Sequence, residues 1–366
     1  MKKSILLLTL MVALGTGATA FAAENDSLTV NGDIRLRFDK QTNYNQPDFN
    51  ANKYRIRLNL GYKLSPEWSF NTRVVAGDSL FGDAPPNVDD VQISVASLTY
   101  KQPDWNATIG RQVFSMFEGL AVSMDDGHTP GDAGYPAAGN RPDGGNAKNF
   151  PSLQGAKFQN KIGKTNVTSF YGNLNARTDD GANYNVKGIA AIGPVGAFKV
   201  GGMVYTTDSY VSAADVSKYG VKNGSKTGYS VTANTKLFNN YLYTGAEYIW
   251  GLADTHDKAY KLIAKTPETK KVGDMQYAVE YRNIEQNALD YNSCTNTARG
   301  ISMMRTKNIN IGDFTYWALS AKRQLTPELT ATLFYEKYNP QNHGKTTPSS
   351  AQVEDQVYRL QLDYKF

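Results

Sequence analysis

The amino-acid sequence predicts an all-β protein, a transmembrane antiparallel β-barrel of about 16 strands. Three observations support this fold class. Segments of about ten residues alternate apolar and polar side chains, the connections between them alternate between a short turn and a longer loop, and the chain begins with an export signal. Side chains on a strand point alternately to its two sides, so this period of two gives each segment one apolar face.

Composition narrows the class further. A chain of 366 residues fits one large barrel or two ordinary domains. A mean hydropathy of −0.48 is too polar for a bundle of membrane helices. The 23 Tyr and 32 Gly are typical of strands joined by turns, and the single Cys294 excludes an intramolecular disulfide and a cysteine-rich metal site.

The first residues have the features of a secretory signal peptide. Lys2 and Lys3 give a basic start, residues 5–14 form an apolar run too short to span a membrane, and Ala20-Phe21-Ala22 supplies a small-x-small cleavage signal. We therefore expect a signal peptide over 1–22 and a mature barrel over 23–366. Removal of the signal peptide takes away Lys2 and Lys3 and lowers the formal net charge from +5 to +3. Export and this weak charge argue against a nucleic-acid partner.

Five alternating segments come first. They are 27–40, 54–63, 68–76, 91–101 and 105–114. The first has Leu28, Val30 and Ile34 on one face and Asp33 with Arg35 on the other. Short turns follow the second and fourth segments, and polar loops follow the first and third. The alternation is least regular in 91–101.

A long irregular segment, 115–150, follows and is rich in Gly, Pro, Asn and Asp. Unstructured loops of this length are uncommon in compact domains and are usually functional or disordered. Alternation then resumes in eleven segments: 152–159, 166–173, 183–192, 197–205, 229–237, 241–250, 258–264, 275–283, 314–323, 329–338 and 355–366. The last two long connections carry Cys294 and a Pro- and Ser-containing stretch.

The count of about 16 strands is even, and each strand is long enough to cross a bilayer when tilted. Short turns on one side and longer loops on the other are typical of exported barrels. A spanning sheet must also close, because an open edge leaves unpaired backbone groups in lipid. The alternative is an exported soluble all-β sandwich or solenoid, which gives no reason for the alternating loop lengths.

Aromatic side chains fall near the ends of the segments, where interfacial girdles form. Those beside short turns are Trp68, Trp105, Tyr100, Tyr62, Tyr364 and Phe366, and those near the longer loops are Tyr54, Phe38 and Trp250. In the last segment Tyr358 and Phe366 stand at opposite ends of one apolar row. The sequence therefore predicts an aromatic belt at each interface.

Two short motifs resemble those of the Gram-negative outer-membrane porins. Gly110-Arg111-Gln112 ends the fifth segment before a long acidic loop, and Tyr364 with the final Phe366 looks like the family's signal for the outer-membrane assembly machinery. The resemblance implies a barrel in the outer membrane of a Gram-negative cell, in contact with lipid and lipopolysaccharide and often a homotrimer. It also implies that the long third extracellular loop folds into the lumen and narrows a pore for passive diffusion.

A pore needs an electrostatic wall rather than a catalytic group, since rings of charged side chains bias which ions pass. Alternation places five arginines on the inner face of the first three strands: Arg35, Arg37, Arg55, Arg57 and Arg73. We call them the arginine strip. They can form a positive wall, pair with Asp33 or loop acids, or do both. Strict alternation puts Arg111 on the lipid face, but a β-bulge near Gly110 would bring it into the lumen, as the resemblance implies.

The long loop carries the opposite charge. Its acids are Glu118, Asp125, Asp126, Asp132 and Asp143. With Arg141 and Lys148 the loop has a formal charge of 2 − 5 = −3. Folded inward, its acids would face the arginine strip and set up a transverse field across the throat. The alternative is a solvated surface loop.

Four functions remain open at this point. They are a general porin, a substrate-specific channel for anions, sugars or amino acids, an outer-membrane enzyme, and a plugged adhesin or structural barrel. Most aromatics fall on the outward face, which favours the general porin over a sugar channel. The histidines, His128, His256 and His343, all lie in expected loops without a serine nucleophile motif. We expect no enzyme activity, no cofactor and no metal.

Overall fold

The computed structural model describes residues 27–43, 46–77, 91–124, 153–173, 184–209, 224–254, 256–285, 288, 314–341 and 355–366. Sixteen strands in these ranges form one closed antiparallel barrel, and two further strands form a small separate sheet. The predicted signal peptide, 1–22, lies outside the described residues. In the described part of the chain no helix is long and apolar enough to cross a membrane.

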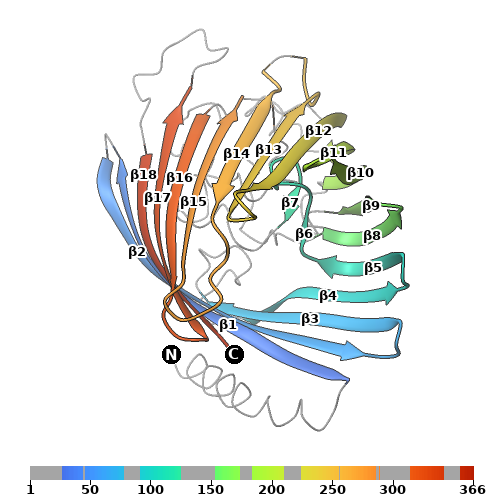
Figure 1. Cartoon of the computed structure of the whole chain (residues 1–366), viewed down its shortest axis with the longest axis horizontal. Coiled ribbons are helices and arrows are strands. Elements are labelled where there is room, and N and C mark those ends of the chain that lie inside the picture. The colour runs from blue at the N-terminus through green and yellow to red at the C-terminus, as the bar shows by residue number, and fades with distance from the viewer. Residues whose placement is uncertain are drawn as a thin grey trace.

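The strands follow one another around the barrel in the order of the sequence (Figure 1). The barrel strands are β1 (Leu28–Asn43), β2 (Gln46–Lys63), β3 (Trp68–Gly77), β4 (Val91–Lys101), β5 (Trp105–Gln112), β8 (Leu153–Ile162), β9 (Thr165–Asn173), β10 (Tyr184–Val195), β11 (Phe198–Ser209), β12 (Gly224–Leu237), β13 (Leu242–Trp250), β14 (Ala259–Lys265), β15 (Met275–Ile284), β16 (Phe314–Gln324), β17 (Leu329–Pro340) and β18 (Asp355–Lys365). The small sheet pairs β6 (Phe114–Ser115) with β7 (Ser123–Met124).

The first and last strands close the barrel. β1 pairs with β18 from Asp33 opposite Lys365 to Asn43 opposite Asp355. The backbones of Gly32 and Phe366 exchange hydrogen bonds of 2.9 and 3.1 Å. A Cβ on Gly32 would lie 2.5 Å from the Phe366 ring, so only glycine leaves room for this ring at the junction.

The two faces of the wall differ as the alternation predicts. Apolar side chains point outward, and many are largely exposed, such as Ile109 at 61% and Leu333 at 60%. Polar side chains between them point inward, such as Thr332 and Arg359, which are buried. A soluble β-protein would bury the apolar face instead, so this arrangement fits a barrel surrounded by lipid.

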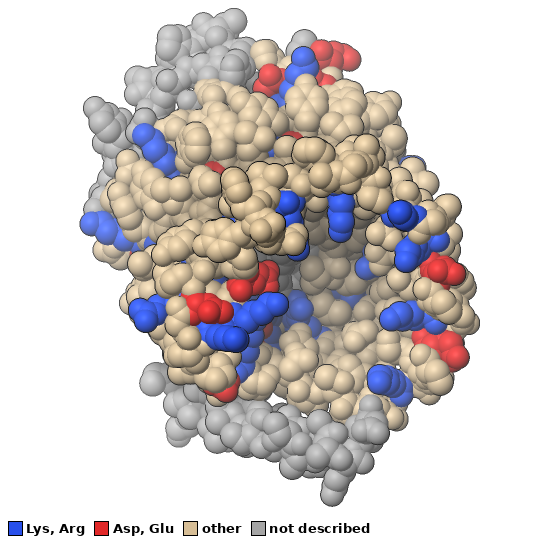
Figure 2. Space-filling model, in the orientation of Figure 1, with Lys and Arg blue, Asp and Glu red and all other residues tan. Residues whose placement is uncertain are grey.

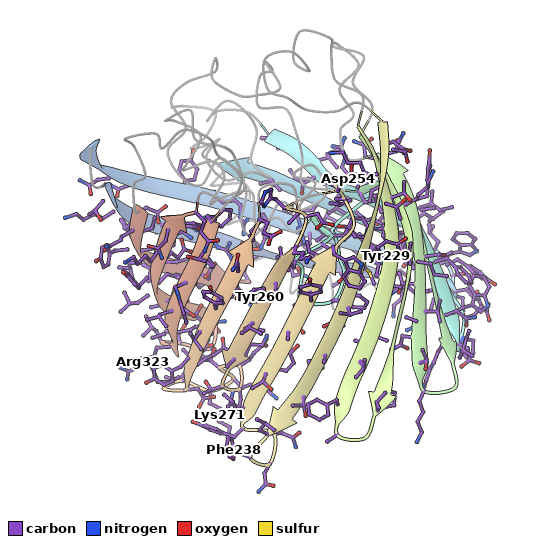
Figure 3. The ribbon with its side chains drawn as sticks, turned by 90° about the horizontal axis from the view of Figure 1, so that it is seen from above. Tyr229, Phe238, Asp254, Tyr260, Lys271 and Arg323 are labelled. Atoms are coloured by element: carbon purple, nitrogen blue, oxygen red, sulfur yellow. The ribbon has the colours of Figure 1, made fainter. Side chains whose placement is uncertain are left out.

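Aromatic rings gather at both ends of the outer surface. Near the short turns, Trp68, Tyr100, Trp105 and Phe158 form a continuous row with ring centroids 4.8, 5.2 and 5.4 Å apart. Towards the other end, Trp250 stacks on Tyr229 at 5.6 Å. Figure 3 shows this separation, with Phe238 at the short turns and Tyr229 and Tyr260 farther up the wall. The predicted places of Trp68, Tyr100, Trp105 and Trp250 agree with the structure.

Three local features differ from the sequence prediction. The stretch 41–53, expected as a polar loop, instead extends the β1–β2 hairpin up to Asn43 and Gln46. The alternation in β4 is irregular because the pairing with β3 shifts by one residue opposite Arg73 and Val74, which leaves Ser94 as a bulged residue. The fifth segment, expected to run to residue 114, ends at Gln112, and Phe114 begins the small sheet.

Candidate functional site

The arginine strip lies on the inner face of β1, β2 and β3. Arg35 stands directly opposite Arg55 in the β1–β2 ladder, and Arg57 stands opposite Asp33. Arg37 and Arg55 are fully buried, at 1% and 0% exposure. Like charges so close together need counter-ions, and the same stretch of wall provides them.

Three aspartates neutralise part of this charge. Asp33 accepts a hydrogen bond from Arg57 Nε at 2.7 Å and lies 3.5 Å from Arg55 Nη2. Asp363 on β18 accepts one from Arg35 Nε at 2.5 Å. Asp39 receives two bonds from Arg359, at 2.6 and 3.2 Å. The expected pairing with Asp33 is therefore confirmed for Arg55 and Arg57, and the role of the arginine strip as a positive wall stays a prediction.

The charged surface of the arginine strip extends onto β18, which was not among the predicted site residues. Arg359 becomes its sixth arginine, and Arg37 Nε donates to Gln361 at 2.8 Å. Six arginines against Asp33, Asp39 and Asp363 leave an excess of three positive charges (6 − 3). The signal was available in the sequence, because Arg359, Gln361 and Asp363 alternate with the outward Tyr358, Leu360 and Leu362.

A second charged cluster lies on the inner face of β14 and β15. Lys261 Nζ is 3.3 Å from Glu280, and Arg282 pairs with the same carboxylate. The Arg282 guanidinium also lies 5.0 Å from the centre of the Tyr316 ring. The inner wall thus carries charged groups on two separate arcs.

The segment after β5 folds into the barrel. Residues 114–124, which we call the inward hairpin, contain the paired strands β6 and β7, and Figure 1 shows them inside the ring of strands. Leu120, Ala121 and Val122 have no exposed surface. They pack in an apolar cluster with wall residues such as Leu153 and Phe170, and the Phe114 ring lies 4.7 Å from that of Phe170. The loop therefore begins as a packed structure inside the lumen, in agreement with the fold prediction.

A buried glutamate on β13 holds the inward hairpin. Glu247, at 1% exposure, accepts backbone N–H bonds from Glu118 at 3.1 Å, Leu120 at 3.0 Å and Ala121 at 3.2 Å. The Ser230 hydroxyl donates to the same carboxylate at 2.8 Å. Both carboxylate oxygens accept hydrogen bonds from the inward hairpin. Four donors converge on one side chain, so Glu247 is the central anchor.

Glu118 adds a second attachment on the same wall. Its carboxylate accepts hydrogen bonds from the Tyr243 hydroxyl and from Asn234 Nδ2, and its backbone carbonyl accepts one from Lys261 Nζ at 2.6 Å. Gly245 makes room, since a Cβ there would lie 2.7 Å from Glu118 Oε1.

The expectation that Glu118 faces the arginine strip is therefore wrong. Counting along β18, β17, β16, β15, β14 and β13, the Glu118 side chain attaches six strands away from β1. The other predicted loop acids, Asp125, Asp126, Asp132 and Asp143, lie outside the described residues, as do Arg141 and Lys148.

Arg111 does not enter the lumen, which corrects the expectation of a bulge near Gly110. β5 pairs residue for residue with both β4 and β8 across this position, so Arg111 stays in phase with the outward Ile109. Its Nη1 donates to the Ile93 carbonyl at 2.8 Å, next to the bulged Ser94. Arg111 thus bonds the backbone beside the β4 bulge on the outer surface, near the end of β5.

The inner face also carries aromatic rings that the sequence analysis did not single out. On β16 and β17, Tyr316 and Tyr338 lie 4.8 Å apart, and Phe314 lies 6.1 Å from Tyr338. These three rings are 1–6% exposed. They support the wall and leave no ring face open to the lumen for a sugar to slide along.

Comparison with known proteins identifies the architecture only. No protein-family model matches the sequence, and no curated protein does. Among solved structures, a triple mutant of Rhodopseudomonas blastica porin matches with a TM-score of 0.52 and 12% identity, over 93% of this chain and 100% of that one. The trimer form of OmpT, an outer membrane protein of Vibrio cholerae, gives the same values.

The chain has an outer-membrane porin fold. Another mutant of the R. blastica porin matches with a TM-score of 0.53 and 14% identity over the same shares of both chains. At identities this low the likeness shows the fold alone. The function therefore depends on the charged wall and the inward hairpin.

Proposed function

We propose that the chain forms a water-filled channel in the outer membrane for passive diffusion of small hydrophilic solutes and ions. The observation that carries the proposal is the charged inner wall of a closed 16-strand barrel whose outer face is apolar. Barrels of 16 strands are wide enough to leave an aqueous channel, whereas eight-stranded barrels fill with side chains. Figure 2 shows a hollow at the centre of the molecule with blue Lys and Arg side chains along it.

The arrangement performs this task without chemistry. The arginines and aspartates of the β1, β2, β3 and β18 wall give the lumen an excess positive charge on one arc, which orients dipolar solutes and favours anions. The inward hairpin occupies the opposite part of the lumen and reduces its width. No reaction step is required of any residue, so we propose no enzymatic activity.

The finer features of the proposal follow from the resemblance and the outer surface. The barrel is inserted in the outer membrane of a Gram-negative cell, in contact with lipid and lipopolysaccharide, and assembles as a homotrimer. Its short turns face the periplasm. Tyr364 and Phe366 present the signal to the assembly machinery, and Phe366 then completes the β1–β18 junction.

Single-channel recording of the purified protein in a planar bilayer tests the proposal. We expect stepwise, long-lived conductance in potassium chloride, with steps grouped in threes for a trimer. The same protein unfolded by boiling is the control and is expected to give no steps. A folded barrel, shown by its heat-modifiable migration in a gel, that stays silent would contradict the diffusion pore and favour a plugged barrel.

A further inference from the structure

Lysines occupy the short-turn ends of eight strands, all on the inner face. We call them the lysine ring: Lys63 on β2, Lys101 on β4, Lys161 on β8, Lys199 on β11, Lys236 on β12, Lys265 on β14, Lys322 on β16 and Lys365 on β18. Each lies at or within two residues of the strand end beside a short turn. They surround the mouth of the barrel at that end.

Register fixes the inward phase of these side chains. Lys63 is in phase with Arg55 and Arg57, and Lys365 is in phase with Asp363. Lys265 stands opposite Tyr243, and the Lys265 Nζ atom lies 5.1 Å from the centre of the Tyr243 ring. The Tyr243 hydroxyl donates a hydrogen bond to Glu118 of the inward hairpin, so both side chains point into the barrel. Because side chains two residues apart share a face, the ring points into the mouth and not into lipid.

The ring has no counter-ions among the described residues. None of the eight lysines is in an ion pair with a described carboxylate, and six of them are exposed while Lys265 and Lys322 are half-buried. The side-chain acids of the short turns are Glu67, Asp104, Glu268, Asp274 and Glu328. Near the eight lysines are therefore these five carboxylates, the carboxyl terminus, and Asp33 and Asp363, which pair with arginines.

Three of these acids bond within their own turns. Glu67 accepts from Ser65 Oγ at 2.9 Å, and Glu328 accepts from Thr326 Oγ1 at 3.1 Å. Asp274 accepts the backbone N–H groups of Lys270 and Lys271 at 2.9 and 2.8 Å, and these two bonds lower the pKa of its carboxyl. Their charge is thus directed at turn backbone and hydroxyl groups rather than at the ring.

The outer surface of the same end carries further positive charge. Lys164, Lys270, Lys271 and Arg323 lie in the turns or on the outward face, and Figure 3 shows Lys271 and Arg323 at the short-turn end. In Figure 2, blue side chains border the central hollow. Positive charge is therefore found on both faces of this end, and the lysine ring is the part of it that points into the mouth.

We propose that the lysine ring is an anion-attracting mouth on the periplasmic side, which concentrates small anions such as chloride, phosphate and carboxylates there. This inference rests on the proposed channel function. Charged groups in a mouth with low-dielectric walls focus the field and raise the local counter-ion concentration. The field reaches about 10 Å at 0.1 M salt but only about 3 Å at 1 M. Anion selectivity therefore depends on which side of the membrane holds the dilute solution.

The test measures reversal potentials in opposed salt gradients. A tenfold potassium chloride gradient is applied across a planar bilayer in one direction and then, after exchange, in the other direction on the same inserted channels. We expect the anion-to-cation permeability ratio to differ about twofold or more between the two directions, because the ring is screened only when the concentrated solution bathes it. Using the same channels removes any need to know their orientation.

Two matched variants assign the asymmetry. The ring variant combines Lys63→Gln, Lys101→Gln, Lys161→Gln and Lys199→Gln. The control removes the same number of charges from the same end with Lys164→Gln, Lys270→Gln, Lys271→Gln and Arg323→Gln. We expect the ring variant to lose most of the asymmetry and the control to keep most of it, with both variants conducting.

The other outcomes separate the failure of this inference from failure of the channel. Conducting wild-type protein with equal ratios in both directions would overturn the lysine ring and leave the channel intact. An asymmetry that both variants reduce equally would assign the effect to the overall charge of this end and would also overturn it. Folded wild-type protein without conductance would overturn both proposals.

Discussion

Replacing Glu247 by Gln is expected to release the inward hairpin and raise the single-channel conductance. Glutamine has the same shape, but its amide group turns two donors towards backbone N–H groups that are themselves donors. Even when the amide oxygen keeps the bonds from Glu118 and Leu120, the N–H group of Ala121 loses its acceptor, and a buried donor left without an acceptor costs about 1–3 kcal/mol. This cost corresponds to a change of about fivefold or more in the ratio of released to bound hairpin. Recordings should show a larger mean conductance and frequent transitions between levels.

Ser230→Ala is the matched control for this variant. It removes the hydroxyl that donates to Glu247 at 2.8 Å but none of the three N–H groups of the inward hairpin. Its conductance is expected to stay close to that of the wild type. If Glu247→Gln folds and conducts with wild-type amplitude and noise, Glu247 is not the anchor.

Replacing Asp33 by Asn is expected to destabilise the barrel and make the channel more selective for anions. The Asp33 carboxylate forms ion pairs with Arg57 Nε at 2.7 Å and with Arg55 Nη2 at 3.5 Å, and the Arg55 side chain has no exposed surface. Removing one partner of a buried ion pair costs about 3–5 kcal/mol, because the remaining charge stays desolvated. The folded form should convert to the slower-migrating unfolded form at a lower temperature, and the reversal potential should shift towards that of chloride.

Asp208→Asn provides the comparison. Asp208 pairs with Lys187 at 3.8 Å, and the lysine side chain is 52% exposed. An exposed pair contributes about 0–1 kcal/mol, so we expect a small change in stability. Equal effects of the two substitutions on unfolding temperature and on reversal potential would show that the Asp33 pairs are not special.

The strands were predictable because each of them has lipid on one side and the lumen on the other, which requires apolar and polar side chains to alternate. The segment predicted as 241–250 is found as Leu242–Trp250, and that predicted as 275–283 is found as Met275–Ile284. Where no bilayer touches the chain, this requirement does not apply. The sequence of 41–53 is rich in Asn and Gln, and the inward hairpin is enclosed by protein, so neither stretch shows the alternation in its sequence.

The site was predictable in part, for reasons that differ between residues. The arginine strip could be assigned to the inner face because phase alone determines it. Glu247 could not be distinguished from any other inward polar residue, since its partners are backbone N–H groups that have no sequence signature. Glu118 attaches to the wall through hydrogen bonds from Tyr243 and Asn234. These residues lie more than a hundred positions away in the chain, so the sequence near Glu118 did not indicate its position.

The junction between β1 and β18 has a consequence for synthesis of the protein. β18 pairs with β1 from Asp33 opposite Lys365 to Asn43 opposite Asp355, and Phe366 adds two backbone bonds to Gly32, so the ring of strands stays open until β18 is present. A chain that stops before Asp355 lacks β18 and leaves β1 and β17 with unsatisfied edges, which a bilayer cannot accommodate. A molecule without β18 therefore cannot close its barrel and yields no stable inserted protein.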